Sequence, residues 1–147
     1  MLEELIMNPS IKEGAVLALF SRENPGLVLT IERTVNGILT YSFPGGKREN
    51  NESIVTTAVR ETYEETGILV KEEDVSVVYS GICTSVGETP YWVTGLAGFV
   101  DSLHGPFTPL EPDMVCRVMS IEEFERDNAF PGFNWHFISN LRALKYI

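Results

Sequence analysis

Residues 46–68 read GKRENNESIVTTAVRETYEETGI, and this stretch decides the fold that we expect. It sets two glycines, four acids and one arginine at fixed offsets: Gly46, Glu52, Arg60, Glu61, Glu64, Glu65 and Gly67. Residues three and four apart share one face of an α-helix, so Glu61, Glu64 and Glu65 are expected to project to one side. Crowded carboxylates repel one another unless a hard cation lies among them, and Mg²⁺ or Mn²⁺ prefers such oxygen ligands. The stretch therefore predicts a divalent-metal site on a helix.

The rest of the stretch is consistent with a helix packed on a core. Its apolar stripe has helical spacing: Ile54, Val55, Ala58, Val59 and Thr62. Asn50 or Asn51 is expected to cap the start, and Gly67 is expected to end the helix. Residues 44–46, Pro-Gly-Gly, predict a tight loop that leads out of a strand.

Arg60 lies four residues before Glu64 and is expected to pair with it. Glu52 lies about two helical turns before Arg60. We expect Glu52 to brace the loop, with metal binding as the alternative.

Residues 46–68 resemble the Nudix box, the hallmark of the Nudix hydrolase family, and Phe43-Pro-Gly-Gly matches the usual lead-in. One position departs, since Thr62 stands where the box has an aliphatic residue. We expect Thr62 to face the core with its hydroxyl bonded back to a helix carbonyl. The resemblance implies one domain over residues 1–147 with an α+β fold, the Nudix-type α/β/α sandwich with a mixed central β-sheet.

The remaining sequence agrees with a mixed sheet between helices. Alternating apolar patterns predict strands over 14–20, 26–32, 39–43, 75–83, 91–100 and 115–119, and helices over 121–126 and 133–144. Asn36-Gly37 is typical of a hairpin turn. Residues 75–83 and 91–100 are expected to pair antiparallel across the loop 85–90.

Composition limits the possible functions. The chain has 147 residues, 44% hydrophobic, and a net charge of −10. Such a chain can bury one core, and its charge argues against binding to duplex nucleic acid. A polyphosphate substrate is also anionic, so an acidic site must take positive charge from a metal. No apolar stretch reaches 18 residues, so no membrane span is expected. Cys83 and Cys116 lack metal-ligand spacing and are expected to be reduced, buried thiols in a cytoplasmic protein.

The Nudix resemblance implies hydrolysis of a pyrophosphate bond in a nucleoside diphosphate linked to another group. It implies that Glu61, Glu64 and Glu65 hold Mg²⁺, or Mn²⁺, with help from the carbonyl of Gly45 or Gly46. Arg60 belongs to the same catalytic set through its pairing with the box acids.

The general base is not fixed by the resemblance, because relatives use a box glutamate or an acid on a later loop. Glu111, which precedes a strand, is our first choice outside the box. Glu88 and Asp113 are further candidates, and Glu64 or Glu65 could also serve. The alternative for each loop acid is an ordinary solvated side chain.

Substrate choice depends on residues outside the box. Residues 130–138 resemble the segment before the last helix of MutT-type 8-oxo-dGTP pyrophosphatases. By that resemblance Asn134 reads a purine edge and Phe133 or Trp135 stacks on the base. The alternative is that Asn134 caps the last helix while Trp135 and Phe137 fill the core. His136 is expected to pack rather than to catalyse.

Marker motifs of other Nudix subfamilies are missing, which favours a purine nucleoside triphosphate. Residues 29–33 only faintly resemble a motif of coenzyme A pyrophosphatases, and Arg33 is a further candidate for substrate binding. Nucleotide sugars, ADP-ribose and dinucleoside polyphosphates are the alternative substrates. A module that binds a nucleotide or an RNA end without hydrolysis is the alternative of another class. Either a monomer or a homodimer is expected.

Overall fold

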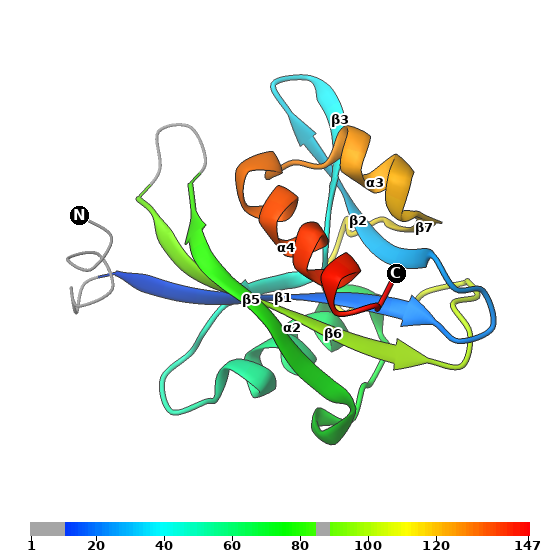
Figure 1. Cartoon of the computed structure of the whole chain (residues 1–147), viewed down its shortest axis with the longest axis horizontal. Coiled ribbons are helices and arrows are strands. Elements are labelled where there is room, and N and C mark those ends of the chain that lie inside the picture. Colours follow the sequence, from blue (N-terminus) through cyan, green and yellow to red (C-terminus); the bar gives the residue numbers. More distant parts are fainter. Residues whose placement is uncertain (1–10, 85–88) are drawn as a thin grey trace.

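The computed structural model describes residues 11–84 and 89–147, and it consists of one mixed β-sheet with helices on both faces (Figure 1). The strands are β1 (Lys12–Ser21), β2 (Leu27–Val35), β3 (Ile38–Ser42), β4 (Gly45–Lys47), β5 (Val75–Cys83), β6 (Tyr91–Val100) and β7 (Cys116–Ser120). The helices are α2 (Ile54–Thr66), α3 (Ile121–Asp127) and α4 (Pro131–Ala143), with a short 3₁₀ turn η1 (Glu72–Asp74). This confirms the α+β sandwich expected from the sequence.

Strand β1 organises the sheet, whose main order is β3-β2-β1-β6-β5. It pairs in parallel with β6 along its whole length, whereas the β5–β6 and β2–β3 pairs are antiparallel. The other edge of β1 is divided, because its start pairs with β4 and its end with β2. Strand β7 joins the sheet through β2. The division places the two glycines of β4 beside the start of β1.

The core lies in two layers, one on each face of the sheet. Side chains alternate along β1, so Leu17 and Leu19 face α2, while Ala18 and Phe20 face α3 and α4. Figure 1 shows α2 below the sheet and α3 and α4 above it. Among the described residues, no helix is long and apolar enough to cross a membrane.

Helix α2 begins after Ser53, whose Oγ accepts the N–H of Thr56 at 3.1 Å. The expected cap at Asn50 or Asn51 is therefore wrong. The chain still turns at those residues, with Asn51 at φ 68°, and enters the helix three residues later at Ile54. Gly67 ends the helix as expected, with φ 79° and its N–H bonded to the carbonyl of Tyr63.

Two local expectations need correction. Residues 45–47 form β4 rather than a loop, because glycine lets this strand approach β1 closely: a Cβ on Gly45 would lie 2.2 Å from the carbonyl oxygen of Ala15. Thr62 is fully buried as expected, but its hydroxyl has no hydrogen-bond partner among the described residues. Thr66 makes the bond back instead, to the carbonyl of Thr62 at 2.7 Å. The Asn36-Gly37 turn is confirmed, with φ 52° and 77°.

Candidate active site

Three carboxylates meet at the end of α2. Glu61, Glu64 and Glu111 each offer one oxygen, and these oxygens lie within 4.8 Å of one another. Glu111 reaches the helix through its backbone, because the N–H groups of Leu110 and Glu111 donate to the carbonyl of Glu64 at 2.8 and 3.2 Å. The expected site acids Glu61 and Glu64 are thus joined by the loop acid that was the first choice for a base.

Arg60 holds this cluster from the side of the helix start. Its Nη1 donates to Glu61 at 2.9 Å and to Glu64 at 3.2 Å, so the expected Arg60–Glu64 pair is confirmed. Its Nη2 and Nε donate to the two oxygens of Glu52 at 2.7 and 3.0 Å. Glu52 also accepts the N–H of Glu49 at 2.9 Å, which braces the loop before α2.

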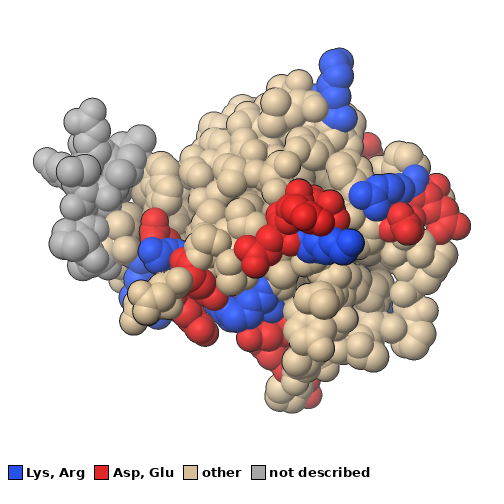
Figure 2. Space-filling model, turned by 90° about the horizontal axis from the view of Figure 1, so that it is seen from below, with Lys and Arg blue, Asp and Glu red and all other residues tan. Residues whose placement is uncertain are grey.

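These contacts shift the protonation of the acids. The bond from Arg60 lowers the pKa of Glu52 to about 2 and raises the pKa of Arg60 itself. Burial raises the pKa of Glu61, and the charges of Glu64 and Glu111 act in the same direction. Figure 2 shows acidic and basic side chains interleaved on the face of the molecule that carries α2.

Glu65 lies outside this group of three acids, against β4, although the charges of Glu61 and Glu111 still act on it. Glu65 is only 3% exposed. Its Oε1 accepts a hydrogen bond from the N–H of Gly45 at 2.7 Å, and its Oε2 accepts one from Nη2 of Arg33 at 3.2 Å. Burial raises the pKa of Glu65 to about 7, although both donors oppose the shift. The structure therefore brings Glu111 rather than Glu65 into the group with Glu61 and Glu64.

The donor set suits a divalent cation. Glu61, Glu64 and Glu111 supply hard oxygen ligands, which Mg²⁺ and Mn²⁺ prefer, and their mutual repulsion favours a positive charge among them. Gly46 lies directly against this group, since a Cβ there would be 2.5 Å from Cδ of Glu61. The residues therefore fit a divalent metal.

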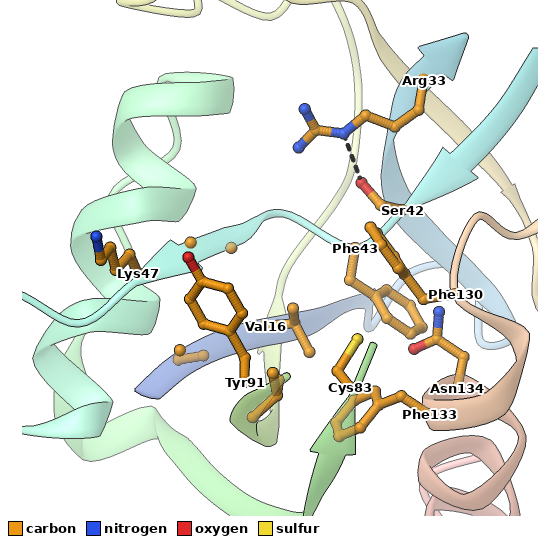
Figure 3. A pocket seen from close by; sticks show the side chains of 15 residues that line it. Val16, Arg33, Ser42, Phe43, Lys47, Cys83, Tyr91, Phe130, Phe133 and Asn134 are labelled. Carbon is orange, nitrogen blue, oxygen red and sulfur yellow. Dashed lines mark hydrogen bonds between the residues drawn. The ribbon is translucent and has the colours of Figure 1, made fainter. Parts of the chain in front are cut away.

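A cavity of about 310 Å³ opens against β4 (Figure 3). Gly45 and Gly46 line it and also touch Glu65 and Glu61, so β4 forms the wall between the cavity and the carboxylates. Arg33 lines it too and is held by Ser42, whose Oγ accepts Nε at 3.0 Å.

The far end of the cavity is built by the start of α4. Phe133 and Asn134 line it, and both are buried, at 5% and 3% exposure. Asn134 does not cap the helix, because α4 begins at Pro131, three residues earlier. This removes the capping alternative for Asn134.

Trp135 follows Asn134 on α4, but its side chain points away from the cavity. Each helical residue is rotated about 100° from the last, so Trp135 is 68% exposed and does not line the cavity. The structure therefore does not support stacking of Trp135 on a base, nor its place in the core. Phe137 is fully buried, and His136 packs on the ring of Tyr79.

Several lining residues were not found from the sequence: Ser42, Lys47, Cys83, Tyr91 and Phe130. They come from five separate segments, four of them strands of the sheet and one the residue before α4, and these meet only in the folded chain, so no local pattern marks them. Asp113 is exposed at φ 63° and lies outside the carboxylate cluster, and Glu88 lies outside the described residues.

Comparisons with known proteins agree with this geometry. The family model described as the NUDIX domain matches residues 12–141. A "MutT-like protein" of Streptomyces ambofaciens is 38% identical over 72 residues, which is 49% of this chain and 45% of that protein. "Phosphatase NudJ" of Escherichia coli K12 is 31% identical over 99 residues, 67% of this chain and 63% of that protein. The matches thus span about half to two thirds of these relatives' lengths.

A solved structure has the same fold. The NUDIX hydrolase from Nitrosomonas europaea superposes with a TM-score of 0.73 at 21% identity, over 91% of this chain and 90% of that one. The family match, the carboxylate cluster and the fold lead to one conclusion: the chain belongs to the NUDIX family.

Proposed function

We propose that this protein is a Mg²⁺-dependent pyrophosphohydrolase whose preferred substrate is a purine nucleoside triphosphate, such as dGTP or 8-oxo-dGTP. The products would be the nucleoside monophosphate and pyrophosphate. Mn²⁺ is the alternative cation. From the sequence we also predict that the protein is cytoplasmic and that it is a monomer or a homodimer.

One observation supports the proposal most strongly. Gly46 touches the carboxylate of Glu61 on one side and lines the cavity on the other. A nucleotide whose base enters the cavity would therefore place its phosphates beside Glu61, Glu64 and Glu111. The cavity is about 310 Å³ and mainly apolar, with Asn134 at its end, which suits a nucleobase.

The acids would hold the cation, with Glu65 and a carbonyl of Gly45 or Gly46 as further proposed ligands. When bound, Mg²⁺ neutralises phosphate oxygens and lowers the pKa of water. A carboxylate oxygen of Glu111 would accept the proton of the attacking water. The new bond forms between water oxygen and the α-phosphorus, and the α–β anhydride bond breaks with its electron pair leaving on pyrophosphate.

The remaining polar groups would orient the substrate. Arg33 is fixed by Ser42 and Glu65, so its unused N–H groups are available to phosphate oxygens. Arg60 would keep Glu61 and Glu64 in place through its two bonds. Asn134 would bind the base, and Phe133 would pack on it.

A substrate panel tests the proposal. Pure protein with Mg²⁺ is incubated with canonical and oxidised nucleoside triphosphates, nucleotide sugars, ADP-ribose and dinucleoside polyphosphates, and released pyrophosphate and phosphate are measured. Fastest pyrophosphate release from a purine triphosphate is expected. Turnover confined to sugar or dinucleotide substrates would contradict the substrate assignment, and no turnover of any compound would favour a binding module.

A further inference from the structure

Asn128, which no pattern in the sequence marked, lies at the junction between α3 and α4 next to the cavity. Its backbone is anchored to the sheet, because it bridges Tyr41 of β3 and the following N–H, that of Ala129, donates to the Tyr41 carbonyl at 2.8 Å. The position of its side chain is therefore set by the sheet.

Two backbone groups fix the orientation of the Asn128 carboxamide. Its Nδ2 donates to the carbonyl of Glu125 at 3.0 Å, and its Oδ1 accepts the N–H of Phe130 at 3.2 Å. A carbonyl can only accept and a backbone N–H can only donate, so the reversed orientation would lose both bonds. The oxygen of Asn128 must therefore face α4.

The orientation of Asn128 also sets the orientation of the Asn134 carboxamide. Its Nδ2 donates to Oδ1 of Asn128 at 3.2 Å, and an oxygen in that place would face another oxygen. With Nδ2 held by Asn128, Oδ1 lies at the other end of the Asn134 carboxamide, and Figure 3 shows this side chain lining the cavity. A ligand in the cavity would therefore face Oδ1 of Asn134, a hydrogen-bond acceptor held in one orientation.

We propose that Asn128 is a positioning residue that determines base specificity by holding the Asn134 carboxamide in one orientation. This rests on the proposed function. With Oδ1 directed into the cavity, the site selects a base edge that presents an N–H donor. Without Asn128, the Asn134 amide could rotate by 180° and accept bases that present only acceptors there.

Three variants separate this role from a structural one. Asn128→Ala removes the acceptor that orients Asn134. Asn128→Asp loses the bond to the Glu125 carbonyl but keeps an acceptor for both Phe130 and Asn134, and is expected to retain the wild-type base preference. Asn140→Ala is the matched control, because it removes an asparagine of α4 whose Nδ2, like that of Asn128, donates to a backbone carbonyl, that of Val78, at 3.2 Å.

Kinetics over the natural nucleoside triphosphates give the first readout. For Asn128→Ala, the ratio of kcat/KM between best and worst base is expected to fall ~5-fold, the discrimination of about one hydrogen bond. The change is expected in KM, with kcat within about twofold, because the base lies away from the reacting phosphate. An unchanged ratio in a folded Asn128→Ala protein would overturn the inference.

Side-chain amide NMR gives a readout that needs no turnover. The Asn134 NH₂ signals are assigned from their loss in Asn134→Ala. One of the two protons is expected to exchange slowly in wild type and in Asn128→Asp, and fast in Asn128→Ala. Protons that exchange alike in all three proteins would refute the orienting role. A wild-type protein inactive on every nucleotide would refute the proposed function, and the NMR result would still decide the role of Asn128.

Discussion

The backbone N–H of Gly45 donates a 2.7 Å hydrogen bond to Oε1 of Glu65, a residue 20 positions further along the chain. This bond ties β4 to α2, so the strand that lines the cavity and the helix that carries the acids form one unit. Arg33 of β2 completes the arrangement through the other oxygen of Glu65. The protonation of this buried acid is therefore linked to folding.

Stability of the metal-free protein is expected to fall as pH rises from about 4.5 to about 7. The pKa of Glu65 is about 7 when folded against 4.5 for the ordinary group, so the folded state binds more protons in that range. Glu65→Gln removes the share of this loss that belongs to Glu65, which amounts to roughly 3 kcal/mol by linkage. Urea unfolding with a chelator across the range measures it. Glu73→Gln, an exposed acid on η1, is the control, and an equal slope in wild type and Glu65→Gln would contradict the account.

Removing the Arg60 side chain is expected to destabilise the protein by about 2 kcal/mol at neutral pH. The carboxylates of Glu52, Glu61 and Glu64 would then lose the hydrogen bonds that Arg60 donates to them. The effect depends on pH. Glu52 has its pKa lowered to about 2, so the stability from its pair with Arg60 is present above about 4.5 and is lost as pH falls toward 2. The difference in unfolding free energy between wild type and Arg60→Ala should therefore shrink in acid. A difference that is constant with pH would refute the pairing as its cause.

Three alanine substitutions at glycine should have three different results. Gly46→Ala would press a Cβ to within 2.5 Å of the Glu61 carboxylate, a flexible group, so Mg²⁺ affinity should fall with little loss of stability. Gly45→Ala would meet the backbone of β1 at 2.2 Å and should destabilise the fold. Gly132→Ala meets nothing within 4 Å on α4 and should stabilise by about 0.5 kcal/mol. Thermal unfolding with and without Mg²⁺ tests all three, and equal effects of Gly45→Ala and Gly46→Ala would contradict the geometry.

Substitutions of Asn134 and Trp135, neighbours on α4, should differ in their effect on the KM for the nucleotide. Asn134→Ala is expected to raise KM for the preferred nucleotide about tenfold, because it removes the acceptor proposed to bind an N–H of the base. Trp135→Ala should leave KM unchanged, since this side chain does not line the cavity. Steady-state kinetics decides, and a larger effect from Trp135 would mean that the base binds on the outer face of α4.

Much of the fold could be predicted from local patterns. The alternation of residues 75–83 and 91–100 predicted an antiparallel pair with the observed bounds, and the spacing of residues 54–66 predicted α2. Strand β4 could not be predicted this way, because its pairing depends on close contact with β1 rather than on side-chain alternation. The cap at Ser53 was missed because Asn50, Asn51 and Ser53 are all good capping residues, and tertiary packing chooses among them.

Helical spacing predicted only those site residues that lie on α2. Glu61, Glu64 and Glu65 share part of a helix surface, but spacing cannot show that Glu65 turns to Gly45 and Arg33. Glu111 joins the cluster through backbone bonds across 47 residues, and no sequence period encodes such a contact. Asn128 likewise acts through a bond that depends on how α3 meets α4.

The most direct test of the central claim is pyrophosphate release from the preferred purine triphosphate with Mg²⁺ by wild type, Glu111→Gln and Glu73→Gln. We predict that Glu111→Gln lowers kcat on the order of 100-fold, as expected when a group that stabilises or activates the reacting atoms is lost, without lowering the unfolding midpoint. Glu73→Gln should match wild type. Wild-type turnover by folded Glu111→Gln would contradict a catalytic role for the cluster of Glu61, Glu64 and Glu111.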